Sequence, residues 1–417
     1  MTPLRATWAW RFRALLRPLL QAKAGAIGWR AALARVAQVI GHWRPGPAIS
    51  ANAETACLLV IDQRLPDPTL DSGSVRMLEI LGLLGAAGHR LVFMADDGQG
   101  TAADIARLQA MGVTLIGLPG QPDLPRWLGT HHLEAALLAR FPVAEEHLTL
   151  VRRMAPEARI LFDTVDLHFL RLRREAALGN GQGLSPEALD AIERRELAVI
   201  DAADATFVVS ETECTLLSQR RPDAEIKVLS NIHVPVDDSP GPDGRADMLF
   251  VGGMSHAPNL DAVRWFCGDV LPRIRQRLPD AGLHIVGEIS EAVRAEFSSQ
   301  PGVTMHGRIA HLQPLLDSCR LSVAPLRFGA GVKGKVNSAM SHGLPVVATS
   351  VAAEGMHLAD GRDVLIADDG QSFADACIRL FTDDALWRQL SEGGRENIRR
   401  HFSREAAAAV LEQALER

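Results

Sequence analysis

The chain has 417 residues, which at roughly 150 residues per domain predicts two or three domains. Apolar residues make up 47% and charged residues 23%, as in an ordinary globular protein. The net charge of −6 gives no general attraction to nucleic acid, so we expect no nucleic-acid partner. Scattered cysteines without a CxxC pair argue against a zinc site or a disulfide framework and fit a reducing cytoplasm. The five cysteines are Cys57, Cys214, Cys267, Cys319 and Cys377.

Residues 1–53 differ from the rest of the chain in charge. No acidic residue precedes Glu54, whereas eight residues of this stretch are basic. Aromatic and leucine side chains interleave with them, which indicates a basic amphipathic segment. Three interpretations stay open. Residues 1–44 could lie on an anionic membrane surface, making a cytoplasmic protein peripheral on the inner face, they could form a helical extension packed on the protein, or they could be a linker left from an upstream domain. No run of ~18 apolar residues predicts a spanning helix, and no secretory signal is evident.

From residue 54 the pattern alternates between buried strands and helices. The apolar run 56–61 ends at Asp62, as is typical of a strand buried in a parallel sheet, and a helix is expected over 75–87. This alternation predicts a sheet covered by helices on both faces. Further strands are expected at 91–95, 113–116, 159–162, 206–209 and 227–229.

A stretch rich in proline, glycine and aspartate, residues 236–247, reads as a linker. The alternation then restarts, so we expect an α/β protein with two Rossmann-like α/β/α lobes, residues 54–235 and 248–402, facing across a cleft, plus the N-terminal helical extension. The last helix, 403–417, could pack back on the first lobe. Strands of the second lobe are expected at 248–251, 284–286, 304–306, 321–324 and 345–348.

The strongest signal is a glycine-rich turn, GAGVKGK at 329–335, which follows the strand 321–324 and opens a helix ending before Gly343. Glycines let a backbone approach an anion closely, and the first N–H groups of a helix bind phosphate. Lys333 and Lys335 add cations. When a bound diphosphate departs as a leaving group, negative charge grows on it, so these cations would be catalytic as well as adhesive. Taken alone, such a short motif also fits a turn with solvated lysines.

The layout continues beyond this turn. Gly331 and Lys333 are followed by AMSHGLPVVAT at 339–349 and by Glu354-Gly355. This arrangement resembles the donor site of group-1 (family 4-like) retaining glycosyltransferases of the GT-B fold. Those proteins have a glycine-rich loop with a basic residue, a helix ending in A-M-x-x-G-x-P-V-V-A-T, and a glutamate–glycine pair.

The resemblance implies a site for a nucleotide-sugar donor. Residues 248–263 look like the first strand, turn and helix of the family's nucleotide lobe, and the family commonly holds the nucleobase just after the strand that ends at Gly307. The implied donor-binding residues are Gly73, Gly252, Gly253, Arg308, Ile309, Gly331, Val332, Lys335, Asn337, Ser338 and Glu354.

One departure from the family concerns the ribose of the donor. The family usually carries two glutamates eight positions apart, the second bonded to the ribose, where this chain has Ala330 and Ser338. Asn337, Ser338 or Glu354 could supply a replacement hydrogen bond, or the donor could be held mainly by its phosphates.

Two polar segments follow strands of the first lobe, where open α/β sheets bind ligands. Residues 71–74 (DSGS) resemble the loop that reaches toward the donor, although Ser72 and Ser74 would serve equally well as helix caps. Arg76 could approach the diphosphate.

Residues 163–168 (DTVDLH) look like the family's segment that places a His or an Asp near the anomeric carbon of the sugar. Asp166 and His168 therefore join Lys333 as the expected catalytic residues. The structural alternative is a loop histidine satisfied by Asp166. The residues that follow are interpreted as a solvated helix face, with a lesser role facing an anionic acceptor as the alternative: Arg171, Arg173, Arg174 and Glu175. The spacing of Ser210 and Glu213 predicts a structural capping box.

The chain contains no Asp-x-Asp triplet, so we expect no metal and no cofactor besides the substrate. The sequence predicts a hexosyltransferase-type glycosyltransferase of polysaccharide biosynthesis. It would move a sugar from a nucleoside-diphosphate sugar to a glycan, lipid-linked or similar envelope acceptor, metal-independently and with retention. The alternatives are a non-catalytic nucleotide-sugar-binding GT-B module and a sugar-nucleotide epimerase of the same fold.

Overall fold

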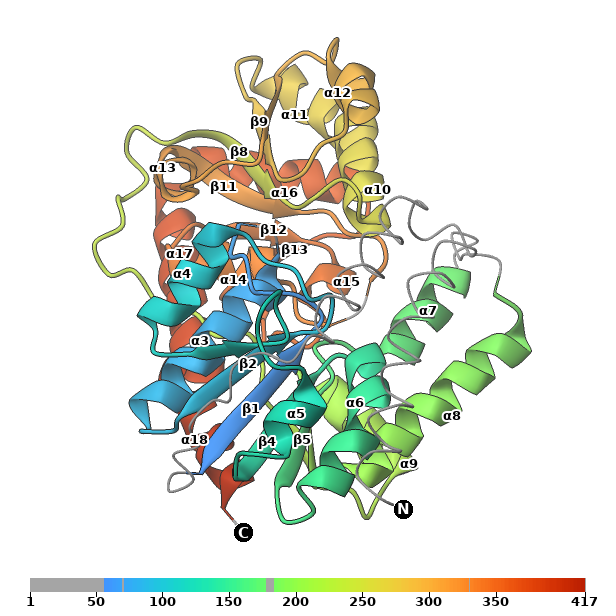
Figure 1. Cartoon of the computed structure of the whole chain (residues 1–417). Coiled ribbons are helices and arrows are strands. Elements are labelled where there is room, and N and C mark those ends of the chain that lie inside the picture. Colours follow the sequence, from blue (N-terminus) through green and yellow to red (C-terminus); the bar gives the residue numbers. More distant parts are fainter. Residues whose placement is uncertain (1–55, 70, 178–183, 330, 417) are drawn as a thin grey trace. The chain divides into compact units, whose positions relative to one another are not determined.

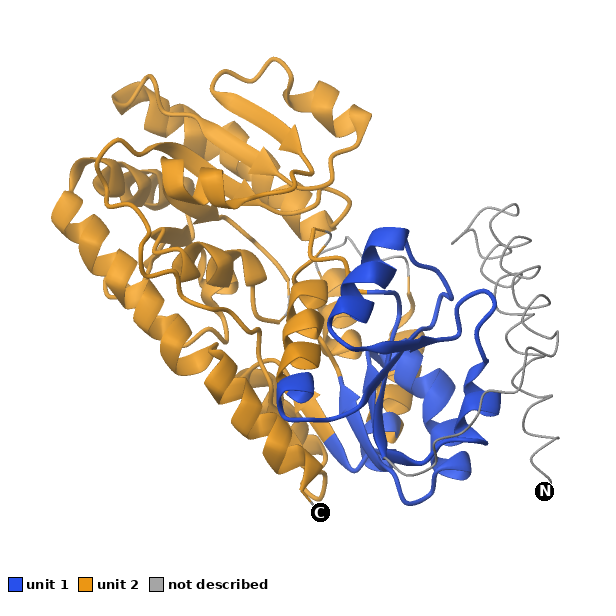
Figure 2. Cartoon of the chain, turned by 60° about the vertical axis from the view of Figure 1, so that its left-hand side comes forward, with its two compact units in different colours: residues 1–65, 84–163, 199–205 blue, residues 66–83, 164–198, 206–417 orange. Residues whose placement is uncertain are grey.

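The computed structural model describes residues 56–69, 71–177, 184–329 and 331–416. The basic N-terminal extension, and with it the question of membrane contact, lies outside the described residues. Figure 2 colours two compact units, one of residues 1–65, 84–163 and 199–205 and the other of residues 66–83, 164–198 and 206–417. No helix among the described residues is both long enough and apolar enough to cross a membrane.

The first sheet has seven strands in the order β3-β2-β1-β4-β5-β6-β7, and the pairings described are parallel. β1 is buried over its whole length, which explains its unbroken apolar sequence. The strands are β1 (Cys57–Asp62), β2 (Leu91–Ala95), β3 (Thr114–Ile116), β4 (Leu133–Ala139), β5 (Arg159–Asp163), β6 (Ala205–Val208) and β7 (Ile226–Val228).

The second sheet has six parallel strands in the order β10-β9-β8-β11-β12-β13. Figure 1 labels β8, β9, β11, β12 and β13. Phe250, Phe266 and Phe373 are fully buried in the core beneath it. The strands are β8 (Ala246–Val251), β9 (Leu283–Val286), β10 (Val303–Gly307), β11 (Cys319–Ala324), β12 (Val346–Ala348) and β13 (Leu365–Ile366).

Helices connect successive strands, as parallel pairing requires. Those up to β7 are α3 (Ser72–Ala86), α4 (Ala102–Ala110), α5 (Leu124–Leu128), α6 (Phe141–Met154), α7 (His168–Ala177), α8 (Pro186–Ala202) and α9 (Glu211–Arg220). Those after β8 are α10 (Ala257–Trp265), a π-helical segment (Phe266–Val270), α11 (Leu271–Arg277), α12 (Glu291–Phe297), α13 (Gln313–Ser318), α14 (Gly334–Ser341), α15 (Ser350–Ala353), α16 (Gly370–Thr382), α17 (Asp384–His401) and α18 (Arg404–Leu415).

The structure confirms the two α/β domains and the eleven predicted strands, with ends shifted by at most two residues. The sequence missed β4 and β13. It also placed the start of α3 too late: the helix begins at Ser72, and Asp71 rather than a serine caps it by accepting the N–H of Ser74 at 2.7 Å. At the other end of the chain, Arg404 of α18 pairs with Glu79 of α3 at 2.8 Å.

Candidate functional site

Helix α14 starts directly after the glycine-rich turn and packs against β11 and α17. Lys333 precedes its first residue with an extended backbone (φ −90°, ψ 95°), and no side chain caps the helix. The first turn contains no acidic residue. The helix therefore presents uncapped N–H groups and the positive end of its dipole, which suits an anion.

Two glycines of the turn are required by their surroundings. Gly331 has a φ of +70°, a left-handed conformation that most side chains disfavour. A Cβ atom on Gly334 would lie less than 3.0 Å from the Cβ of Ser72, closer than real Cβ atoms come. The start of α3 therefore lies against the start of α14, and only glycine fits there.

Lys333 lies next to this helix end and is 8% exposed. Its ammonium donates to the carbonyl oxygen of Gly331 at 2.5 Å. Burial lowers the pKa of Lys333 to about 8, while the carboxylates of Glu354, Glu213 and Asp166 favour its charged form. At pH 7 the ammonium is therefore about 90% protonated and can act as a cation.

Lys335 is directed to a different set of partners. Its ammonium donates to Oδ1 of Asn259 at 2.5 Å and lies 4.3 Å from the ring centre of Phe250. A Cβ atom on Gly252 would lie 2.7 Å from Nδ2 of Asn259 and 2.9 Å from Nζ of Lys335. Asn259 in turn donates to the carbonyl of Gly253 at 2.9 Å. The predicted residues Gly252, Gly253 and Lys335 thus gather in one cluster. Burial, then Lys333, lowers the pKa of Lys335 to about 7.

Lysine is rare in this chain. The 44 basic residues include four lysines, Lys23, Lys227, Lys333 and Lys335, and the other forty are arginines. Two of the four lie within three residues of each other at the start of α14. Arginine stays charged at any physiological pH, whereas a buried lysine can lose its proton.

Glu354 is held by Arg174 through two hydrogen bonds of 2.9 and 3.0 Å. Arg174 also donates to the carbonyl of Gly329 at 3.0 Å, so it joins the glycine-rich turn to the loop after α15. The prediction that Arg174 belongs to a solvated face is therefore wrong. Gly355 is needed at this point because a Cβ there would lie 2.9 Å from the Cβ of Ser210.

Asp166 and His168 are linked by Arg171, so the interpretation of this arginine as solvated is also wrong. Arg171 donates to Asp166 at 2.7 Å and contacts Nδ1 of His168 at 2.8 Å. Because arginine can only donate, Nδ1 accepts and the neutral ring carries its proton on Nε2. Burial, then Arg171, lowers the pKa of His168, which favours the neutral ring at pH 7. Val165 precedes this group with a φ of +63°, a strained value for a β-branched residue.

Glu196 of α8 fixes the start of α7, a role that the sequence did not reveal. Its side chain is fully buried and accepts the backbone N–H of His168 at 3.0 Å and of Phe169 at 2.7 Å. Burial raises the pKa of Glu196 to about 7, although the two hydrogen bonds lower it. Because it lies 28 residues from His168, no local pattern predicts the contact.

Glu213 was predicted to close a capping box, and the structure shows only half of one. Ser210 accepts the N–H of Glu213, but the Glu213 carboxylate accepts from Val209 at 3.3 Å instead of returning to Ser210. Oε1 of Glu213 is buried and has no partner with hydrogen-bond geometry among the described residues. It would lie 4.0 Å from a Cβ atom on Gly331, so it faces the glycine-rich turn.

Two of the predicted ribose contacts, Asn337 and Ser338, lie within α14. Asn337 is fully buried, and its Oδ1 accepts from Asn231 at 3.1 Å. Ser338 is half-buried in α14, and its carbonyl accepts the Ser341 hydroxyl at 2.9 Å. Val332 is half-buried in the turn, and Gly73 lies in the first turn of α3.

Arg76, predicted as a possible diphosphate contact, is buried and donates to the carbonyls of Leu229 at 2.7 Å and Ser230 at 3.0 Å. Arg76 thus joins α3 to the segment that follows β7.

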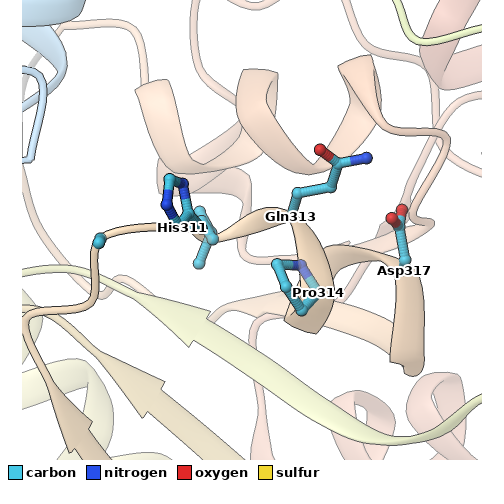
Figure 3. Close-up of a pocket in the computed structure, with 6 residues that line it drawn as sticks. His311, Gln313, Pro314 and Asp317 are labelled. Atoms are coloured by element: carbon cyan, nitrogen blue, oxygen red, sulfur yellow. The ribbon is translucent and has the colours of Figure 1, made fainter.

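Arg308 and Ile309, the predicted nucleobase positions, follow β10 directly. Arg308 is exposed, and its guanidinium lies 3.9 Å from the carboxylate of Glu288. Just beyond them is a hollow of about 580 Å³, around which Figure 3 shows the side chains of α13 and the loop before it. Neither predicted residue lines it. Its lining residues are Ala310, His311, Leu312, Gln313, Pro314 and Asp317.

The structure therefore brings one group of predicted residues together: Gly331, Lys333, Asp166 and Glu354 lie around the turn before α14. Lys335 forms a neighbouring cluster with the Gly252-Gly253 pair. Arg174, Glu196 and Glu213 belong to the same surroundings although the sequence did not point to them. Uncapped helix amides, a buried ammonium and paired carboxylates suit a ligand with both a diphosphate and hydroxyl groups.

Solved structures identify the class of fold. The crystal structure of HepE from Anabaena in complex with UDP is similar over 87% of this chain and 99% of that protein, with a TM-score of 0.65 and 14% identity. Sucrose-phosphate synthase from Thermosynechococcus elongatus is similar over 86% of this chain and 98% of that protein, with a TM-score of 0.63 and 16% identity. The chain has the GT-B fold.

A family model identifies the second domain more closely. Residues 245–383 match the family "Glycosyl transferases group 1". A curated relative, "Uncharacterized 44.6 kDa protein in cps region" of Klebsiella pneumoniae, is 32% identical over 136 residues, which are 31% of this chain and 35% of that protein. The match thus spans about a third of the relative's length. This GT-B chain carries a group 1 glycosyl transferase domain, and the matched region contains Lys333, α14 and Glu354.

Proposed function

We propose that the chain is a glycosyltransferase that transfers a sugar, with retention, from a nucleoside-diphosphate sugar to a glycan, lipid-linked or similar envelope acceptor. The group 1 domain and the UDP bound to HepE, a protein of the same fold, support this reaction class. The relative from a cps region supports a role in polysaccharide biosynthesis.

The observation that carries the proposal is the uncapped start of α14 with the buried ammonium of Lys333 beside it. A departing nucleoside diphosphate gains negative charge as the bond between the donor's sugar and its diphosphate breaks. Helix amides and a lysine in a partly dehydrated site stabilise that charge more in the transition state than in the ground state, which accelerates the reaction. His168 and Asp166 are proposed to contact the sugar or the acceptor hydroxyl.

The test is a panel of nucleoside-diphosphate sugars with envelope glycans and lipid-linked acceptors, scored for transferred sugar. Lys333→Ala should lower kcat by about 100-fold or more, because it removes one stabilising group from the leaving diphosphate. Lys227→Ala is the matched control, since this lysine lies on β7 and pairs with Glu225 at 3.2 Å. Equal activity of the two variants would contradict the assigned role of Lys333.

The proposed reaction needs no metal, because Lys333 and the helix amides supply the positive charge. Among the residues that the structure describes, no three metal-ligating side chains come together. Activity should therefore be unchanged by EDTA and by added Mg²⁺ or Mn²⁺. Loss of activity with EDTA and its recovery with either ion would contradict this part of the proposal.

Ser338 motivates a second candidate, a nucleotide-sugar-binding module without turnover, because it stands where the family has its ribose-binding glutamate. That candidate expects donor binding with no product against any acceptor. An epimerase of the same fold would instead release an altered sugar without an acceptor. Product analysis with and without acceptor separates the three.

A further inference from the structure

We propose that Glu213 is a positioning residue of the diphosphate site, a buried carboxyl behind Gly331 that must be uncharged for a nucleoside diphosphate to bind tightly beside Lys333. This inference rests on the proposed function, since it concerns the same donor site. It assigns to Glu213 more than the capping role indicated by its place in α9.

The side chains of Glu213 and Lys333 both lie next to Gly331. Oε1 of Glu213 would lie 4.0 Å from a Cβ atom on Gly331, and Nζ of Lys333 donates to the carbonyl of Gly331 at 2.5 Å. Glu213 is 2% exposed, and its charge is one of those that raise the pKa of Lys333. A change in the charge of Glu213 therefore changes the electrostatic potential at the turn that would hold the diphosphate.

Glu213 differs from two neighbouring carboxylates in what balances its charge. Glu354 is paired with Arg174 and Asp166 with Arg171, whereas Glu213, like Glu196, is next to backbone N–H groups. No arginine contacts Glu213 among the described residues, so its cationic neighbour is Lys333.

Several groups act on the ionisation of Glu213. Burial raises its pKa to about 7, and Asp166, from the loop after β5, adds to the rise. Glu196 of α8 is a further acidic neighbour, and Glu213 contributes to the raised pKa of Glu196. The N–H groups of Val209 and Leu167, and Lys333, favour the charged form. The carboxyl therefore titrates near the pH at which the protein would work.

A bound diphosphate adds negative charge beside Lys333 and so favours the neutral form of Glu213. Above its pKa the ionised carboxylate competes with the diphosphate for Lys333 and repels it. Binding should therefore take up a proton near pH 8, and affinity should fall as the pH rises from 6 to 8. Glutamine keeps the shape of the side chain without the charge and should weaken this dependence, leaving the part that Lys333 contributes through its own pKa of about 8.

The experiment measures binding of UDP, GDP, ADP and inorganic pyrophosphate by calorimetry at pH 6 and pH 8, in two buffers that differ in ionisation enthalpy. Glu213→Gln should bind the tightest of these ligands about five- to tenfold more strongly than the wild type at pH 8, the size of one nearby charge at an effective dielectric constant of about 20–40. At pH 6 the two should bind alike. Ionisation of the ligand is common to both proteins and cancels in the comparison. Glu211→Gln, on an exposed residue of the same helix, is the matched control and should behave as the wild type.

A role in structure alone would lower the unfolding temperature of Glu213→Gln and leave the pH dependence of binding as in the wild type, which overturns the proposal. Should the glutamine variant not fold, the double variant Lys333→Arg/Lys335→Met gives the answer with UDP as the ligand, because neither replacement titrates and the terminal phosphate of UDP is ionised at pH 8. Its binding should still take up a proton, and no uptake overturns the proposal.

Sugar transfer is scored separately, so the two proposals can fail independently. Binding with the expected pH linkage but no product leaves the role of Glu213 standing and removes the proposed function. If the wild type forms product, but its binding depends on pH in the same way as that of Glu213→Gln, the proposed function stands and the role of Glu213 is overturned. If neither the nucleoside diphosphates nor pyrophosphate bind, both proposals are overturned.

Discussion

Replacing Gly334 by alanine tests how tightly the start of α14 is held against α3. Alanine favours a helix over glycine by about 1 kcal/mol. The added methyl group, however, would lie less than 3.0 Å from the Cβ of Ser72, an atom fixed to its own backbone. Relief requires one helix to move, and such overpacking costs about 1–3 kcal/mol. We expect a net loss of up to about 2 kcal/mol, together with weaker donor binding.

The assay is denaturant-induced unfolding combined with nucleotide binding. Gly268→Ala is the matched control, because this helical glycine has nothing within 4 Å of the added Cβ, and it should be neutral or slightly stabilising. Ser72→Gly removes the opposing Cβ, so the double variant should recover both stability and binding. The reasoning is refuted if Gly334→Ala is as stable as Gly268→Ala, or if Ser72→Gly fails to rescue it.

Two further predictions concern buried charged groups. Lys335→Met should stabilise the fold by about 1–3 kcal/mol at pH 6 and by less as the pH rises to 10. The reason is that Lys335 in the folded protein, with a pKa of about 7, binds fewer protons than it does in the unfolded chain over that range. Unfolding midpoints measured across pH check this, and a gain in stability that does not change with pH would contradict it. Glu196→Ala should lower the free energy of unfolding by about 1–3 kcal/mol and reduce kcat, since two buried N–H groups at the start of α7 lose their acceptor. Glu187→Ala, on an exposed residue of the same helix, is its control, and equal effects of the two variants would show that Glu196 does not fix α7.

Runs of apolar residues predicted most of the strands. One central strand was missed because its residues favour a helix. β1 is apolar throughout because both its faces are covered, and its sequence shows this directly. β4 reads LEAALLA, a composition of strong helix formers, yet it lies between β1 and β5 in the middle of the sheet. Burial there outweighs helix propensity, and the sequence of one segment cannot reveal which neighbours will cover it.

The site shows the same division between local and distant information. Gly331 and Lys333 could be predicted because a turn and a helix start carry their function within a few residues. The charged residues around them could not be predicted, because they come from distant parts of the chain. Arg174 and Glu354, for example, are 180 residues apart. Glu213 was recognised as a helix-cap residue from its spacing to Ser210, which gave no hint that its carboxylate faces Gly331.

The scarcity of lysine has a consequence for protein chemistry. Acylating reagents attack the neutral amine, and an ordinary lysine with a pKa near 10.4 has about 0.04% of it at pH 7. Lys333 and Lys335, with pKa values of about 8 and 7, have roughly 10% and 50%. Whenever solvent reaches the turn, amine labelling should therefore mark these two residues ahead of Lys227, and a ligand seated there would shield them. A chain whose basic surface is nearly all arginine thus carries few competing targets for such a reagent.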